Sequence, residues 1–208
     1  MELSEAVRRR RMVRTYDPDR PVPREVVRRL LDLALRSPSA GHSQGRDVVV
    51  LADPADRARF WAATTDPAAA PDGWLLGMRT APVLVLWCSD PGAYRRRYAE
   101  PDKARAAAER EDADWPVPYW DVDTGMAAMV LLLGAVDEGL GACFFGVPPG
   151  RHDAVREAFA VPADRRLVGV VSLGWPAPDR RSPRLARGRR PLDEVVSWGR
   201  FGRPAPEG

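Results

Sequence analysis

The side chains with the clearest chemistry lie near the start of the chain, where five arginines fall within residues 8–14. Arginine is the side chain best matched to phosphate, because its planar guanidinium donates two parallel hydrogen bonds to two oxygens. A second basic group stands near the other end, at Arg184, Arg187, Arg189 and Arg190. Each such charge-assisted hydrogen bond contributes about 1.5–3 kcal/mol. If the fold brings both groups together, they form a site for one phosphate.

The composition limits what the number of arginines can mean. The chain has 208 residues, is 45% hydrophobic and carries a formal net charge of +3, with acidic and basic residues mixed along it. Lys103 is the only lysine, so part of the arginine richness reflects coding bias. A nucleic-acid-binding protein usually has a larger or more one-sided basic excess. We therefore expect no nucleic-acid partner and argue from the positions of the arginines.

The sequence lacks the common catalytic and phosphate-binding motifs. Gly139, Gly141 and Gly146 have the wrong spacing for a dinucleotide fingerprint and precede a predicted strand. A phosphate loop of the G-x-x-x-x-G-K-[ST] type and a G-x-S-x-G elbow are also absent. Enzymatic chemistry would then come from a bound cofactor, and no catalytic side chain is predicted.

Cysteines and histidines give no metal-ligand spacing. Cys88 and Cys143 lie in apolar surroundings and are predicted to be buried, reduced thiols. His42 and His152 stand far apart in the sequence, so we expect no metal site. The N-terminus has no apolar signal-peptide region, and the apolar stretch 126–136 is too short to span a bilayer. We expect a cytoplasmic protein with no membrane partner.

The hydrophobic pattern predicts a single α+β domain over residues 1–208, with helices on both faces of a sheet. Helices are expected after a Ser4 cap, from Pro23 to Ser37, and over residues 54–64, 92–114, 121–138 and 152–159. Strands are expected at residues 48–51, 82–87, 139–146 and 167–174, a loop at 66–77, and a tail that wraps over another element at 175–208. Because the 121–138 helix is apolar on nearly every face, we expect it to be buried in a core or an interface.

Four segments together resemble the nitroreductase-like FMN-dependent oxidoreductases. Residues 10–16, Arg-Arg-Met-Val-Arg-Thr-Tyr, resemble the family's Arg-Arg-Ser-Val-Arg-x-Phe/Tyr opening. Residues 38–44, Pro-Ser-Ala-Gly-His-Ser-Gln, are similar to its Pro-Ser-x-x-Asn-x-Gln loop. Residues 123–146 resemble its buried helix and glycine turn, and residues 187–192 resemble its basic C-terminal phosphate clasp.

The resemblance implies a three-layer α/β/α fold, with a mixed sheet flanked by helices, in an intertwined homodimer with FMN at the interface. It implies that Arg10, Arg11, Arg14, Arg187 and Arg189 hold the phosphate and ribityl chain. It places Pro38, Ser39, Ala40, His42 and Gln44 against the flavin from the other subunit, and Phe144, Phe145 and Gly146 along the isoalloxazine.

Several positions depart from the family pattern. Met12 replaces a usual serine and removes a hydroxyl donor to the flavin. His42 replaces a usual asparagine, and because imidazole titrates near neutral pH it would make flavin affinity or potential pH-dependent. Gly45-Arg46 stands where Pro-Trp is common. The charged excursion at 92–118 matches no motif and lies where the family varies its substrate lid.

The resemblance implies hydride transfer from NADH or NADPH through flavin N5 to a small organic acceptor such as a nitroaromatic or quinone. One alternative is a flavin-dependent dehydrogenase or flavin-remodelling enzyme of specialised metabolism. In that case Trp115, Tyr119 and Trp120 would stack on an aromatic substrate, although packing in the core explains them more simply. The other alternative is an FMN-binding protein without turnover.

Overall fold

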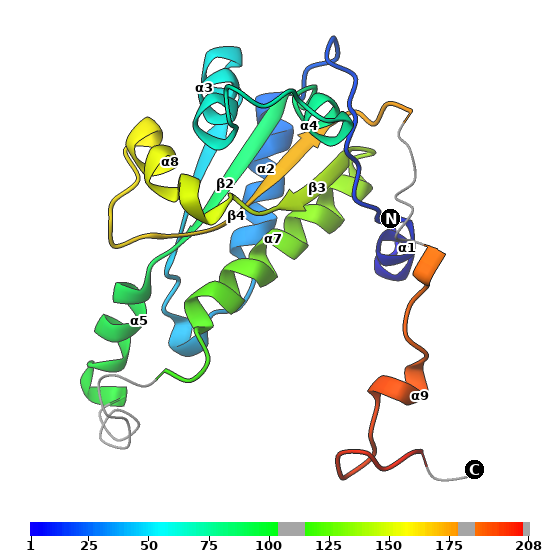
Figure 1. The fold of residues 1–208 in the computed structure, drawn as a ribbon. Coiled ribbons are helices and arrows are strands. Elements are labelled where there is room, and N and C mark those ends of the chain that lie inside the picture. The colour runs from blue at the N-terminus through cyan, green and yellow to red at the C-terminus, as the bar shows by residue number, and fades with distance from the viewer. Residues whose placement is uncertain (104–114, 179–185, 206–208) are drawn as a thin grey trace.

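The protein is built on one four-stranded sheet with the strand order β1-β2-β4-β3 (Figure 1). The computed structural model describes residues 1–103, 115–178 and 186–205. The strands are β1 (Arg46–Leu51), β2 (Val83–Ser89), β3 (Gly141–Phe145) and β4 (Arg166–Gly174). Every residue of the central strand β2 is buried. This two-sided burial explains why β2 is apolar throughout.

Helices cover both faces of the sheet, which confirms the predicted α+β class and its three layers (Figure 1). The α-helices are α1 (Leu3–Arg9), α2 (Arg24–Leu35), α3 (Pro54–Thr64), α4 (Gly73–Met78), α5 (Pro91–Tyr98), α7 (Tyr119–Asp137), α8 (His152–Phe159) and α9 (Leu192–Val195). Short 3₁₀ turns are η1 (Ala40–His42), η2 (Pro101–Lys103) and η3 (Pro149–Arg151).

Side chains alternate along β2 and divide the interior into two cores. Val83, Val85 and Trp87 pack with α2 and α7, whereas Leu84 and Leu86 pack with α3 and α8. This period of two is the normal consequence of strand geometry. The sheet therefore fixes α7 on one face and α3 on the other.

The structure corrects several local expectations. All four strands pair antiparallel, so the sheet is not mixed, and the parallel pairing found in the described residues is the single bridge between Met12 and Ala142. An apolar sequence indicates that a strand is buried on both faces, but it does not indicate whether the strand runs parallel or antiparallel to its neighbours. Ser4 does not cap α1, which begins after Glu2 without a side-chain cap.

The expected loop at 66–77 contains a helix instead. Asp72 caps α4 by accepting a hydrogen bond from Leu75 N, and this short helix is hidden in a Pro-, Ala- and Gly-rich stretch. The predicted excursion at 92–118 begins with α5 and η2, and residues 104–114 lie outside the described part of the chain.

Both cysteines are buried thiols, as predicted. Burial raises the pKa of the Cys88 thiol to about 11, so this thiol is protonated near neutral pH. Helix α7 is long and apolar enough to cross a membrane by length and composition, a test that the core helix of a soluble protein also passes. Here α7 packs on α2 and on strands β2, β3 and β4.

The C-terminal tail extends away from the sheet (Figure 1). Every residue from 186 to 205 is exposed. Leu192 is 72% exposed, Trp198 is 55% exposed and Phe201 is fully exposed. The expectation that the tail wraps over another element is therefore not met by these residues within one chain.

Candidate functional site

The arginine tract runs beside strand β3. Val13 N donates a hydrogen bond to Ala142 O at 2.9 Å, and Met12 forms the parallel bridge with the same residue. The buried Tyr16 hydroxyl donates to Val13 O at 2.6 Å and contacts Ser172 Oγ at 2.7 Å. These bonds hold residues 10–14 at the edge of the sheet, so the positions of the arginines are set by the core.

The arginines of this tract differ in what they contact. Arg8 donates to Ser4 Oγ and Arg9 donates to Glu5 Oε1, both at 3.1 Å within α1. Arg14 Nη1 donates to Met12 O at 3.1 Å, and Arg11 is exposed. Arg10 Nη1 is buried and has no hydrogen-bond partner among the described residues. A buried guanidinium N–H without an acceptor is costly, so this atom fits an anionic ligand.

The next feature is the carboxyl end of β3, where two adjacent phenylalanines face opposite sides of the sheet. Phe144 packs in the α2–α7 core, and Gly169 lies directly under its ring, where a β-carbon would clash. Phe145 turns toward α3 and stacks on Trp61, with ring centroids 5.8 Å apart and planes 9° apart. Gly146 is exposed. Phe145 and Gly146 line a cavity whose described lining does not include Phe144.

This cavity has a volume of about 300 Å³ and lies between α3, α4 and the end of β3. Its lining residues are Phe60, Trp61, Thr64, Thr65, Asp66, Ala69, Ala70, Asp72, Trp74, Leu75, Phe145, Gly146 and Pro148. Gly77 of α4 lies so close to the backbone carbonyl of Arg14 that a β-carbon would not fit. The tract and the cavity are therefore neighbours, connected through α4 and β3.

The predicted loop Pro38–Gln44 is anchored near the N-terminal end of α7. Ala40 N donates to Asp123 Oδ2 at 2.8 Å, and the Tyr94 hydroxyl donates to the same oxygen at 2.7 Å. Arg97 Nε donates to Gly41 O at 2.8 Å. Burial is the main cause that raises the pKa of the Tyr94 hydroxyl, and the hydrogen bond to Asp123 raises it further. The hydroxyl therefore stays protonated at neutral pH and acts as a donor.

The same loop has a strained backbone. Gly41, His42 and Gln44 have φ values of 62°, 58° and 50°. Two of these three residues carry a side chain, and such strain often accompanies ligand sites. Ser39 Oγ accepts a hydrogen bond from Gln44 N at 2.9 Å, and the Gln44 Nε2 and His42 Nε2 atoms are 2.8 Å apart. The loop is thus preorganised and presents the exposed Pro38, His42 and Gln44 side chains.

The N-terminus and this loop contact different ends of α7. Asp123 anchors the loop, while the N-terminal ammonium contacts Asp137 at the other end of α7 at 2.7 Å. The 14-residue separation of these aspartates corresponds to about 21 Å along a helix. Arg187 and Arg189 are exposed in the tail, and Arg184 lies outside the described residues. Within one chain the loop and the N-terminus are therefore attached near opposite ends of α7.

Aromatic side chains join the two ends of the excursion. Trp115 meets Tyr98 edge to face with centroids 4.9 Å apart, and it also contacts Tyr94, Tyr119 and Trp120 at 5.7–6.2 Å. The rings of Trp115, Tyr119 and Trp120 thus pack together, but of the three only Trp120 is buried, Trp115 is half-buried and Tyr119 is 39% exposed.

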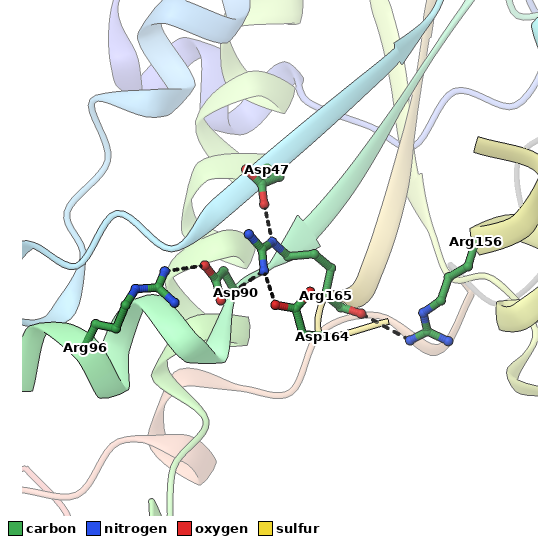
Figure 2. A network of polar contacts seen from close by, with 6 residues as sticks. All are labelled: Asp47, Asp90, Arg96, Arg156, Asp164 and Arg165. Atoms are coloured by element: carbon green, nitrogen blue, oxygen red, sulfur yellow. Dashed lines mark hydrogen bonds and ion pairs between the residues drawn. The ribbon is translucent and has the colours of Figure 1, made fainter. Parts of the chain in front are cut away.

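An ion-pair network fixes the base of α5 (Figure 2). The buried Asp90 carboxylate contacts Arg96 at 3.0 Å and Arg165 at 3.3 Å. Arg165 also contacts Asp47 at 2.5 Å and Asp164 at 2.9 Å. Because α5 carries Tyr94 and Arg97, this network helps to position the Pro38–Gln44 loop.

Sequence reasoning missed the role of Asp123 and of the Asp90 network. A signal for Asp123 was available, because a carboxylate on the buried side of a largely apolar helix needs a hydrogen-bond partner. The Asp90 network had no comparable signal, since its members come from distant segments and stand in ordinary charged stretches of sequence.

We predict that Asp123→Ala lowers the free energy of unfolding by about 1–3 kcal/mol, because it leaves the buried Tyr94 hydroxyl and the half-buried Ala40 N–H without their acceptor. Urea denaturation measures this loss, and amide hydrogen exchange at Ala40 should accelerate. Tyr94→Phe is the matched control, since it removes one donor and leaves the Ala40 bond intact. Unchanged exchange at Ala40 in Asp123→Ala would contradict the anchoring role.

Comparison with known proteins gives a consistent result. The model of the nitroreductase family matches residues 7–175. A 4-nitrobenzoate reductase from a Nocardioides species is 30% identical over 92% of this chain and 87% of its own. An NADH dehydrogenase from Thermus thermophilus is 27% identical over 95% and 96% of the two chains.

A solved structure shares the fold. A Desulfovibrio desulfuricans protein described as a nitroreductase in complex with FMN is 24% identical, covers 99% of each chain and has a TM-score of 0.70. Together with the family match over most of the sequence, the agreement of fold identifies this chain as a member of the nitroreductase family.

Proposed function

We propose that this protein is an FMN-dependent oxidoreductase that transfers hydride from NADH or NADPH through flavin N5 to a small organic acceptor, such as a nitroaromatic or quinone. The observation that carries the proposal is Arg10 Nη1, which is buried without a hydrogen-bond partner among the described residues and lies beside β3, the strand that precedes Gly146. The names of the Nocardioides and Thermus relatives support both the acceptor class and the nicotinamide donor.

FMN supplies the redox chemistry in this proposal, and the side chains bind and orient it. Arg10, Arg11 and Arg14 would bind the phosphate and ribityl chain, joined by Arg187 and Arg189 of the tail. Gly146 leaves space beside the cavity, since a β-carbon there would meet no atom within 4 Å. The Phe145 ring, which lines the cavity, would contact the flavin. Phe144 faces the other side of the sheet and packs in the α2–α7 core.

The proposal requires a second copy of the chain. Because about 21 Å of helix separates the Pro38–Gln44 anchor from the N-terminal contact on α7, the loop would serve the site of the partner subunit. Helix α7 has an exposed apolar stripe that a partner subunit would bury. Its residues Val122, Met126 and Met129 are 37%, 44% and 38% exposed. The exposed apolar residues of the tail, Trp198 and Phe201 among them, would cover the partner in the same homodimer.

The first test is flavin binding and reduction. Purified protein reconstituted with FMN should be yellow, and NADH or NADPH should bleach it under anaerobic conditions. We expect Arg10→Ala to raise the FMN dissociation constant by about 10- to 100-fold, the loss of one charge-assisted contact. Arg14→Ala should also weaken binding strongly. Arg9→Ala is the matched control and should leave binding unchanged within about twofold, because its charge-assisted contact lies within α1.

Three outcomes decide the proposal. A colourless protein that cannot be loaded with FMN would rule it out. A yellow protein that neither nicotinamide bleaches would support the non-catalytic FMN-binding alternative or a different electron donor. Equal effects of Arg9→Ala and Arg10→Ala would show that the positions of the arginines do not matter.

The second test is the oligomeric state. Met126→Lys with Met129→Lys places two charges on the exposed stripe of α7 and should convert a dimer to a monomer of 23.0 kDa. Light scattering after size exclusion measures the mass. Val50→Lys is the control, since Val50 has the same 38% exposure as Met129 but lies on the edge strand β1. A monomeric wild-type protein that binds FMN tightly would contradict the shared site.

A further inference from the structure

Helix α5, at the start of the excursion, packs against the Pro38–Gln44 loop. Arg97 of this helix donates from Nε to Gly41 O at 2.8 Å. The ring of Tyr98 covers the same glycine, since a β-carbon on Gly41 would come within 2.8 Å of Tyr98 Cε2. The contact therefore falls where the loop backbone turns with positive φ values, at Gly41 and His42.

The guanidinium of Arg97 joins the loop to η2 (Pro101–Lys103). Its Nη1 and Nη2 atoms donate to Asp102 Oδ1 and Oδ2 at 2.8 and 2.7 Å, and Nη1 also donates to Glu100 Oε2 at 2.9 Å. The Arg97 side chain is only 23% exposed, so these bonds are partly shielded from water. Because a guanidinium is a rigid planar fork, the position of Asp102 fixes the direction in which Nε meets the loop.

Strand β1 and helix α7 hold the loop at its start. Arg46 Nη2 donates to Ser37 O at 2.7 Å, and Asp123 Oδ2 accepts from Ala40 N at 2.8 Å. Arg97 adds a bond at the next residue, where the positive φ values begin. Residues in unfavourable backbone conformations persist only where their surroundings hold them. A loop released by Arg97 would therefore keep its place in the fold but lose the shape of its turn.

An aromatic pair links the two described ends of the excursion at this point. Tyr98 meets Trp115 edge to face with ring centroids 4.9 Å apart, a favoured geometry for aromatic side chains. The two residues belong to the described segments 92–103 and 115–118. Since Tyr98 also covers Gly41, both segments meet at the side chain that packs on the turn of the loop.

We propose that Arg97 is a positioning residue that sets the shape of the loop turn, so that FMN binding depends on the position of η2. This rests on the proposed function, in which the loop presents His42 and Gln44 to the FMN of the partner subunit. A movement of η2 that carried Asp102 away would release Gly41 O. The two loop side chains would then lose the conformation in which they meet the flavin.

The first test measures FMN affinity by titrating the flavin fluorescence. Arg97→Ala should raise the dissociation constant about 3- to 10-fold, the range expected for a residue that acts through a network. Arg97→Lys keeps the charge but cannot bind Gly41 O and both oxygens of Asp102 at once, so it should restore only part of the affinity. Arg95→Ala is the matched control, because Arg95 is an exposed arginine of the same helix, and it should change the constant by less than about twofold.

A double-mutant cycle separates positioning from a general loss of structure. His42→Ala removes the contact between His42 and Gln44, whose Nε2 atoms are 2.8 Å apart. If Arg97 acts through this part of the loop, adding Arg97→Ala to His42→Ala should weaken FMN binding by only about twofold or less. Fully additive effects would overturn the inference, because the loss would then not pass through the loop.

Amide hydrogen exchange on the full chain before FMN is added tests the coupling without the flavin. His42 N donates to Ser39 O at 2.8 Å and Ser43 N donates to Ala40 O at 3.2 Å, so both amides report on the turn. Arg97→Ala should accelerate their exchange about threefold or more, and Arg95→Ala should not. Accelerated exchange in a protein that never binds FMN would uphold the coupling and reject the proposed function. Unchanged exchange and unchanged FMN affinity in Arg97→Ala would overturn the coupling and leave the proposed function standing.

Discussion

The length of helix α7 is the constraint on which the rest of this structure depends. It packs along the sheet with Ala127, Ala128 and Leu131 fully or almost fully buried, and it carries an anchor for a different segment at each end. Asp123 near its start holds the Pro38–Gln44 loop, and Asp137 at its end contacts the N-terminus. Because a helix is stiff, these anchors stay about 21 Å apart whatever the loops do.

Each half of the proposed site is formed but incomplete in one chain. The loop is held in a strained conformation by Asp123 and Arg97, which preserves its shape before any ligand binds. The tract is fixed to β3, and Arg10 keeps a buried N–H that has no acceptor in the described part of the chain. A partner subunit and a bound anion would complete both halves, and the exposed apolar stripe on α7 indicates where that partner would pack.

The sequence predicted the features that depend on local pattern. The apolar run at β2 and the helical stripe of α2 were found with nearly correct bounds, because burial on one or both faces leaves a periodic signature. The direction of the strands leaves no such signature, and the short helix α4 was hidden by its Pro- and Gly-rich surroundings. The sequence analysis placed both Phe144 and Phe145 along the isoalloxazine, although the period of a strand turns their rings to opposite faces of the sheet. The ion pairs of Asp90 join segments far apart in sequence and could not be predicted.

The central claim is that one FMN site takes its loop from one chain and its arginine tract from another. The most direct test is to co-express two tagged variants, Arg10→Ala with Arg14→Ala in one chain and His42→Ala with Gln44→Ala in the other. The heterodimer is then isolated through both tags and its FMN content is measured. A shared site predicts one FMN per two chains, because one of the two sites contains neither defect. FMN binding no greater than that of the two variant homodimers would contradict the account, since each chain would then build its own site and both sites would be defective.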